Sequence, residues 1–356
     1  ACRQADPVAG VEAIRAIRRR ELFRVAAGDL CGLTDVHAVG QALSDLASAT
    51  IDAALAVARG SVEAAHVPRI AVIAMGRWGG HEMSYASDAD AMFVMDDGDG
   101  QEDRGDPTKV AGAVISLMRR LLTRPGADPV LSIDADLRPE GKGGALIRSL
   151  TAYRNYYSRW SSTWEMQALV RAEALAGDEA LGAELLAEID TRRWPEGGLQ
   201  NSQLTEIRKL KARVEAERLP RGADPAKHTK LGPGGLADVE WTVQLLQLQH
   251  AHAVPTLRSS QTVVALRAAA DAGVISTRDA GHLEAAWTLA SRIRNAIMLV
   301  RGRGSDSLPT DIRELAAVAE LLGYGPGTSS HLLADYRRVT RRARGVVDRV
   351  FWGQAT

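Results

Sequence analysis

Cysteine and aromatic residues are scarce in this sequence. Two of its 356 residues are cysteines, Cys2 and Cys31, and aromatic residues make up 4% of the chain. Two cysteines without a CxxC spacing or a nearby histidine cluster do not form a zinc site, and we interpret them as reduced thiols of a cytoplasmic protein. The low aromatic content argues against a surface on which nucleic-acid bases stack.

An excess of charge and a long apolar run are also missing. The sequence has 44 Lys and Arg residues and 44 Asp and Glu residues, so its formal net charge is zero. A protein held to nucleic acid by phosphate contacts usually carries a basic excess, so we expect no nucleic-acid partner. No apolar segment reaches the roughly 20 residues that cross a bilayer, and no signal-peptide core is recognisable. We therefore expect no membrane partner and a cytoplasmic location.

The order of the apolar patterns predicts an α+β fold. Short apolar runs at 70–75 and 89–95 and an alternating run at 130–137 predict three strands. Helical spacing predicts helices at 12–29, 36–59 and 107–124, and then a largely helical remainder that begins with a long helix over 151–175.

These patterns divide the chain into three parts. We expect N-terminal helices at 1–60, a small mixed-sheet domain with flanking helices at 61–175, and an all-helical domain at 176–356. The N-terminal helices are expected to pack on the mixed-sheet domain.

A group of carboxylates stands at the strand positions of the mixed-sheet domain. Asp88 and Asp90 are two residues apart at the start of a strand, so both side chains point to the same face. Two like charges held this close repel unless a cation lies between them, and Mg²⁺ typically takes one or two carboxylates plus substrate phosphates. Asp134, on the polar face of another strand, could supply a third ligand, and Asp136 on that face is the alternative. Three carboxylates can hold two metal ions about 3.5–4 Å apart for displacement at phosphorus.

Several other residues are candidates for binding phosphate. Gly79 and Gly80 lack a Cβ, so their backbone N–H groups could approach a phosphate, and Ser87 could donate its hydroxyl or amide. Arg138 is either a phosphate ligand or part of a structural ion pair. Lys230 precedes a glycine-rich turn that leads into a helix, which is either a second nucleotide contact or a helix cap with packing. Taken alone, a DxD or a GG is usually a solvated strand end or a turn, but their combination here favours function.

The segment GRWGGHEMSYASDADAMFV resembles the signature of the nucleotidyltransferase superfamily that includes DNA polymerase β. More narrowly, it is similar to the glutamine synthetase adenylyltransferase family. Three further segments carry the same resemblance: DADLRPEG at 134–141, the AYRNYY to GD segment at 152–178 and KLGPGGLADVEWTVQLLQLQH at 230–250. Two departures are Arg77-Trp78 for the commoner Lys-Leu and Asp136 for Arg or Asn.

The resemblance implies a nucleotidyltransferase domain at 61–175 that uses ATP with Mg²⁺ or Mn²⁺. It implies that Asp88, Asp90 and Asp134 hold the metal and that AMP is transferred to a tyrosine of glutamine synthetase, which down-regulates nitrogen assimilation. Pyrophosphate is the product that leaves. Glutamine synthetase is the expected protein partner, and a PII-type signalling protein is expected to act through regions that this chain lacks.

Full-length members of the family carry two such units, one that attaches AMP and one that removes it by phosphorolysis. This chain has one SDxD motif, and the Ser84-Tyr85-Ala86 that precedes it favours the C-terminal, attaching half. The alternative is the removing half, in which phosphate releases ADP from adenylyl-tyrosine. A nucleotide-binding regulatory module without turnover is a further alternative, against which the intact carboxylates argue.

Overall fold

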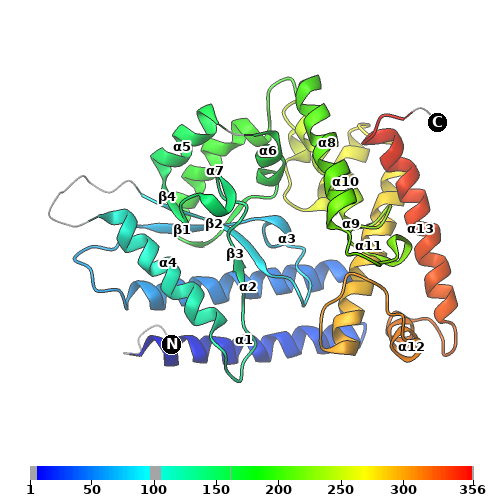
Figure 1. The fold of residues 1–356 in the computed structure, drawn as a ribbon, viewed down its shortest axis with the longest axis horizontal. Helices are drawn as coiled ribbons and strands as arrows, with labels where there is room; N and C mark the ends of the chain where they lie inside the picture. Colours follow the sequence, from blue (N-terminus) through cyan, green and yellow to red (C-terminus); the bar gives the residue numbers. More distant parts are fainter. Residues whose placement is uncertain (1–5, 97–105, 161, 355–356) are drawn as a thin grey trace. The chain divides into compact units, whose positions relative to one another are not determined.

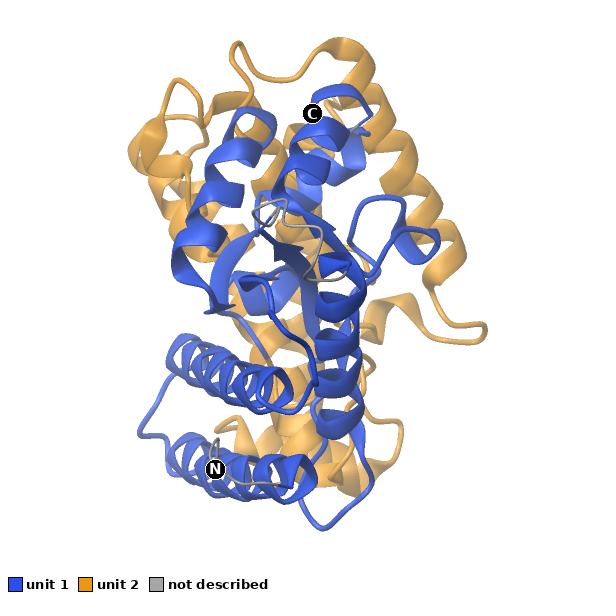
Figure 2. Cartoon of the chain, turned by 90° about the vertical axis from the view of Figure 1, so that its left-hand side faces the viewer, with its two compact units in different colours: residues 1–83, 87–193 blue, residues 84–86, 194–356 orange. Residues whose placement is uncertain are grey.

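The computed structural model describes residues 6–96, 106–160 and 162–354. They form two compact units, which Figure 2 distinguishes by colour: residues 1–83 and 87–193 in the first, and residues 84–86 and 194–356 in the second. Cys2 and most of the acidic segment after β2 lie outside the described residues, and Cys31 is a free, exposed thiol.

The first unit combines a five-stranded sheet with helices (Figure 1). Its elements are α1 (Pro7–Leu30), α2 (Val36–Arg59), β1 (Ile70–Ala74), α3 (Gly76–Gly79), β2 (Ala89–Met95), α4 (Pro107–Thr123), β3 (Ile133–Asp134), a 3₁₀ turn (Gly141–Gly143), β4 (Ile147–Ser149), α5 (Leu150–Arg159), α6 (Thr163–Leu169), β5 (Glu173–Gly177) and α7 (Glu179–Arg193). The α+β class predicted from the sequence is confirmed.

Short polar side chains fix where the helices of this unit begin. Asp35 accepts a hydrogen bond from the Ala38 amide at 2.8 Å and so caps α2. Asp106 caps α4 in the same way, and a proline follows it at the first helical position. Each cap satisfies an amide that has no partner within its helix, and proline is tolerated there because its missing N–H would be unpaired anyway.

The sheet is mixed, with the strand order β3-β2-β1-β5, and β4 pairs with β2 beyond the end of β3. β1 runs antiparallel to both β2 and β5, whereas β3 and β4 run parallel to β2. Helices cover both faces of the sheet (Figure 1). Alternate residues of β1 pack on one face against α5, α6 and α7, in a core that includes Ile73, Tyr153, Leu169 and Leu185. Strands covered on both faces read as continuous apolar runs, which is why β1 and β2 were recognisable in the sequence.

Two sequence predictions about this unit were wrong in part. The strand expected at 130–137 is limited to Ile133–Asp134, although burial still alternates from Leu131 to Ala135 as predicted. The single helix expected at 151–175 is two helices and a strand. The second helix begins anew because Ser162 and Glu165 form a capping box, in which the Ser162 amide donates to Glu165 at 2.8 Å.

Two buried arginines of α1 hold the segment that leads into β3. Arg15 donates to the carbonyls of Arg124, at 2.6 Å, and of Asp128. Arg18 donates to the carbonyls of Pro129 and Val130 at 3.3 Å. Burial, together with the charge of Arg15, lowers the pKa of Arg18 to about 10. Segment 124–130 has little regular structure, so these arginines supply partners that its carbonyls would otherwise lack.

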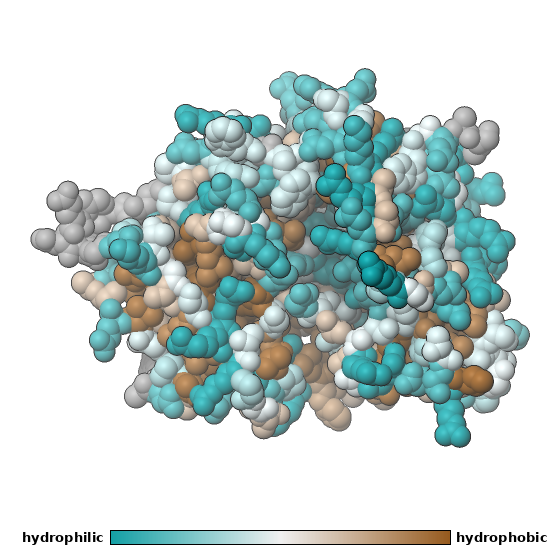
Figure 3. Space-filling view, viewed as in Figure 1, coloured by the Kyte–Doolittle hydropathy of each residue, from teal (hydrophilic) through white to brown (hydrophobic). Residues whose placement is uncertain are grey.

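The described part of the second unit is mostly helical. Its elements are α8 (Asn201–Arg218), α9 (Leu236–His250), α10 (Thr262–Asp271), α11 (Thr277–Arg301), α12 (Ile312–Leu321) and α13 (Ser329–Val350), with short 3₁₀ turns at Pro225–Lys227 and Pro255–Leu257. Among the described residues, none of the helices is both long enough and apolar enough to span a bilayer. Figure 3 shows polar residues spread over the whole visible face, with apolar residues between them.

Candidate functional site

Strand register brings the predicted carboxylates together. β2 and β3 are paired so that Asp90 lies directly beside Asp134, and Asp88 precedes Asp90 by two residues. One carboxylate oxygen from each of the three residues lies within 4.8 Å of those of the other two. Asp88 is exposed, whereas Asp90 and Asp134 are half-buried. Among the described residues, this is the one cluster of three or more acidic, histidine or cysteine side chains close enough to share a cation.

The donor set fits a hard divalent cation. Three carboxylates at this spacing repel one another, and a cation placed between them would remove that repulsion. Their oxygens are the ligand type that Mg²⁺ and Mn²⁺ take, and the exposure of Asp88 leaves this group open to further ligands.

Gly76 fits closely against this group. An ideal Cβ on Gly76 would lie 2.2 Å from Oδ2 of Asp90, and its φ of +53° is one that other residues rarely adopt. The neighbouring Met75 amide donates to the Asp90 carbonyl at 2.8 Å. Sequence reasoning missed Gly76. The available signal was its position directly after a buried strand, where the chain has to turn.

Gly79 and Gly80, predicted to approach phosphate, have a different neighbour. A Cβ on Gly79 would lie 1.9 Å from the carbonyl oxygen of Arg171, and one on Gly80 would lie 1.9 Å from its guanidinium. The two amides donate to the carbonyls of Met75 and Gly76 at 2.9 and 3.1 Å. Because they lack a Cβ, these two glycines leave room for Arg171. A phosphate contact by their amides remains a prediction that would require this turn to open.

The loop after β3 separates the two candidate third ligands. Asp134 accepts a hydrogen bond from the Asp136 amide at 2.7 Å. The Asp136 carboxylate instead lies 3.3 Å from Lys142 and 3.8 Å from Arg138, and it does not belong to the cluster. The geometry thus favours Asp134, which sequence reasoning had preferred without excluding Asp136.

The Arg138 side chain binds the backbone of that loop. Its guanidinium donates to the carbonyls of Ala135, Lys142 and Gly144 at 2.7–3.0 Å. A phosphate contact by Arg138 stays a prediction, as does one by the half-buried Ser87 next to Asp88.

The glycine-rich turn before α9, in the second unit, is closed by its own carbonyls. The amides of Leu236 and Ala237 donate to the carbonyls of Thr229 and Lys230 at 2.9 Å, and the Gly235 amide donates within the turn. The first amides of α9 are therefore already paired, as expected for a helix cap. The Lys230 side chain is exposed, and its contact with nucleotide stays a prediction.

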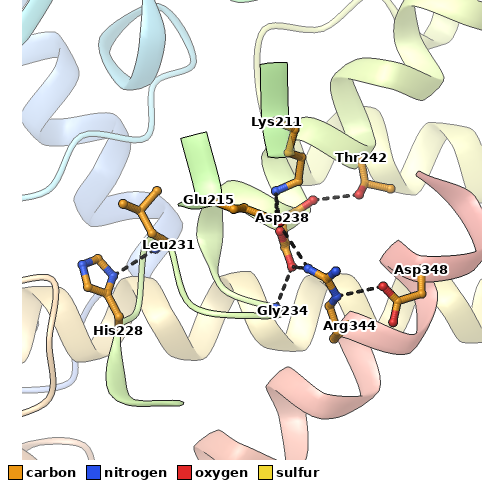
Figure 4. A network of polar contacts seen from close by, with 9 residues as sticks. All are labelled: Lys211, Glu215, His228, Leu231, Gly234, Asp238, Thr242, Arg344 and Asp348. Atoms are coloured by element: carbon orange, nitrogen blue, oxygen red, sulfur yellow. Dashed lines mark hydrogen bonds and ion pairs between the residues drawn. The ribbon is translucent and has the colours of Figure 1, made fainter. Parts of the chain in front are cut away.

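Behind this turn, Asp238 is the centre of a buried network of charges (Figure 4). It accepts hydrogen bonds from Lys211 at 2.5 Å, the Gly234 amide at 2.7 Å and Arg344 at 3.1 Å. Glu215 lies 2.8 Å from Lys211. Burial alone would raise the pKa of Asp238, but attraction to Lys211 and these hydrogen bonds outweigh it and hold the pKa below its ordinary value. The network ties α8, α9 and α13 together.

We expect Asp238→Asn to lower the free energy of unfolding at pH 7 by about 3–5 kcal/mol, because it removes the buried counter-charge that Lys211 and Arg344 share and leaves them the more exposed Glu215 and Asp348. Since the folded-state pKa is lowered, the stabilisation is present above the unfolded pKa of about 3.9 and is lost as the pH falls through the folded value. The difference between mutant and parent should therefore shrink in acid. Denaturant unfolding at pH 7 and near pH 3 measures it.

Asp335→Asn is the control for this change. Asp335 pairs with Arg338 at 2.8 Å, and both side chains are exposed. Surface pairs contribute at most about 1 kcal/mol. If the two variants lower the free energy of unfolding at pH 7 by the same amount, the buried network has no special role in stability.

Comparison with known proteins links these features to a family. A profile of glutamate-ammonia ligase adenylyltransferase matches residues 2–188, and a profile of GlnD PII-uridylyltransferase matches residues 208–351. Bifunctional glutamine synthetase adenylyltransferase/adenylyl-removing enzymes from Cutibacterium acnes and Streptomyces coelicolor are each 53% identical to the chain, over 99% and 98% of its length. The enzyme of that name from Mycolicibacterium smegmatis is 49% identical over 99% of the chain.

The chain spans about a third of these curated relatives, 35% or 36% of their length. The first profile covers more than half of the chain and includes all three clustered carboxylates. The chain therefore belongs to the glutamate–ammonia ligase adenylyltransferase family.

Proposed function

We propose that this chain belongs to the half of the enzyme that attaches AMP, and that it transfers AMP from ATP to a tyrosine of glutamine synthetase. The observation that carries the proposal is the cluster of Asp88, Asp90 and Asp134 within a chain of this family. The relatives' names combine the adenylyltransferase and adenylyl-removing activities, and this chain spans about a third of such a protein. Both substrates, ATP and glutamine synthetase, are part of the proposal, as is a cytoplasmic location.

The three clustered carboxylates have two proposed roles, metal binding and proton transfer. Asp88, Asp90 and Asp134 would hold Mg²⁺ or Mn²⁺, which when bound neutralises phosphate charge and lowers the pKa of the attacking hydroxyl, about 10 in a free tyrosine. The tyrosine oxygen bonds to the α-phosphorus, and the bond from that phosphorus to the bridging oxygen of pyrophosphate breaks. Asp134 accepts the tyrosine proton.

Five further residues are proposed to bind the phosphates of ATP. They are Gly79, Gly80, Ser87, Arg138 and Lys230. The amides of Gly79 and Gly80 and the guanidinium of Arg138 would first have to leave their present backbone partners. Lys230 belongs to the second unit, and its side chain is exposed.

The direction of the reaction rests on Ser84-Tyr85-Ala86 before Ser87-Asp88, which resembles the attaching half. Both directions need the same carboxylates, so the cluster does not distinguish them. What differs is whether the position beside the α-phosphorus receives a protein tyrosine or a phosphate ion. A PII-type protein is a further proposed partner, and the similarity of residues 208–351 to GlnD PII-uridylyltransferase supports this part of the proposal.

The test uses intact-mass spectrometry of glutamine synthetase subunits. With unmodified subunits, ATP and Mg²⁺, we expect a gain of one AMP per subunit and release of pyrophosphate. With adenylylated subunits and phosphate, we expect little loss. Efficient phosphate-dependent loss without gain would show that the chain is the removing half, and ATP binding without either reaction would indicate a regulatory module.

A further inference from the structure

Arg171 and Glu82 form a buried ion pair, and neither residue belongs to the carboxylate cluster. Arg171 pairs with Glu82, and both side chains are about 95% buried. Arg171 stands between α6 and β5, whereas Glu82 ends the turn that begins at Gly76. The pair thus joins two segments that are 89 residues apart in the sequence.

The turn from Gly76 to Glu82 is shaped to admit Arg171. Gly79 and Gly80 have no Cβ at the two places where Arg171 approaches, each of which an ideal Cβ would block at 1.9 Å. The Glu82 amide donates to the Arg77 carbonyl at 2.8 Å, so Glu82 is also part of the turn's backbone.

Helix α2 supports the turn through other contacts. An ideal Cβ on Gly40 would lie 3.2 Å from the Cα of Glu82, so the backbones are close. Trp78, which is fully buried, donates its Nε1–H to the hydroxyl of Ser48 at 3.0 Å. The turn therefore has two sets of supports, one from Arg171 and one from α2.

The first residue of the turn contacts a member of the carboxylate cluster. Gly76 is its first residue, and Oδ2 of Asp90 occupies the space that a Cβ on Gly76 would need. A shift of the turn would therefore move Gly76, against which the Asp90 carboxylate packs. A buried ion pair contributes little net stability compared with well-packed apolar side chains, so stability alone does not account for this arrangement.

We propose that the Glu82–Arg171 pair is a positioning device for the metal site. In the protein without ATP, it fixes the turn from Gly76 to Glu82 and, through Gly76, the carboxylate of Asp90. Arg171 and Glu82 are positioning residues, since neither belongs to the carboxylate cluster. The inference rests on the proposed function, because it assumes that Asp90 binds a divalent cation.

Binding of Mn²⁺ to the protein without ATP tests the proposal separately from turnover. We expect Arg171→Met and Glu82→Gln each to weaken Mn²⁺ affinity about ten- to a hundredfold, the range seen when groups that orient metal ligands are removed. Turnover number should fall as well. Because both variants break one pair, the double variant should weaken affinity little more than either alone. Arg171→Lys should rescue incompletely, since lysine lacks the planar fork of arginine.

Tyr153→Phe is the matched control in the same unit. It removes a buried hydrogen bond from the Tyr153 hydroxyl to the Phe93 carbonyl, 3.1 Å long, on the same strand as Asp90. It should lower the melting temperature and leave Mn²⁺ affinity unchanged.

Two contrary outcomes can be told apart. Unchanged Mn²⁺ affinity in a folded Arg171→Met or Glu82→Gln variant, while Asp90→Asn abolishes binding, would overturn the positioning role and leave the proposed function intact. Unchanged binding in Asp90→Asn would instead overturn the metal site itself. If a single variant does not fold because it leaves one buried charge without its partner, the double variant Arg171→Met/Glu82→Gln, which removes both charges, decides the question.

Discussion

Asp88→Asn, Asp90→Asn and Asp134→Asn should each reduce AMP transfer by at least about a hundredfold, while the protein stays folded. Loss of a group that only orients a metal ligand already costs about 10–100-fold, and these residues are the proposed ligands themselves. Removing one of three mutually repelling carboxylates need not destabilise the fold, so the melting temperature should hold or rise. Incorporation of labelled AMP and thermal unfolding of the same preparations check both parts.

Asp136→Asn provides the control for this series. It makes the same chemical change two residues from Asp134, on a carboxylate that faces Lys142 and Arg138. We expect activity within a few-fold of the parent. A larger loss in Asp136→Asn than in Asp134→Asn would show that Asp136 is the third ligand, and full activity in Asp90→Asn would exclude the metal assignment.

Gly76→Ala should reduce transfer on the order of a hundredfold. The new Cβ would lie 2.2 Å from Oδ2 of Asp90, so the carboxylate or the turn must move by an ångström or more. Misplacement of a reacting group by about 1 Å costs roughly this factor. The residue's φ of +53° adds about 1–2 kcal/mol of strain. Turnover number, Mn²⁺ affinity and melting temperature should be measured on one preparation.

Gly112→Ala separates the effect on the site from the general effect of a methyl group. Gly112 lies within α4, and an ideal Cβ there meets no atom within 4 Å. Alanine in a helix interior is favoured over glycine by about 0.5–1 kcal/mol, so this variant should be at least as stable as the parent and fully active. Equal activity of Gly76→Ala and the parent would show that Asp90 does not depend on the space that Gly76 leaves.

The parts of the fold that local patterns encode were predictable. β1 is apolar throughout, and β2 is apolar after Asp90, because both faces of the sheet are covered. β5 was missed because Glu173-Ala174-Leu175-Ala176 consists of good helix formers, and its strand conformation comes from pairing with β1, about 100 residues earlier. β4 was missed because three residues are too few to show a period.

For the candidate site too, features encoded by neighbouring residues were predictable, and features that depend on distant contacts were not. The spacing of Asp88 and Asp90 is local, so their shared face followed from strand geometry. The preference for Asp134 over Asp136 came from the family resemblance, and the residues alone left it open. Its geometric support required the register with β2 and the position of Lys142. The packing of Gly79 and Gly80 against Arg171 depends on a contact between distant segments, which no single-sequence pattern records.

The two buried arginines of α1 bear on how small a working fragment can be. β3 has two residues, too few to hold a register alone, and the segment before it is fastened by Arg15 and Arg18. A truncated protein that starts at the mixed-sheet domain would keep every clustered carboxylate yet lose the hydrogen bonds from Arg15 and Arg18 to the segment that leads into β3 and Asp134. We therefore expect that the smallest fragment with AMP-transfer activity includes α1 as well as the three carboxylates.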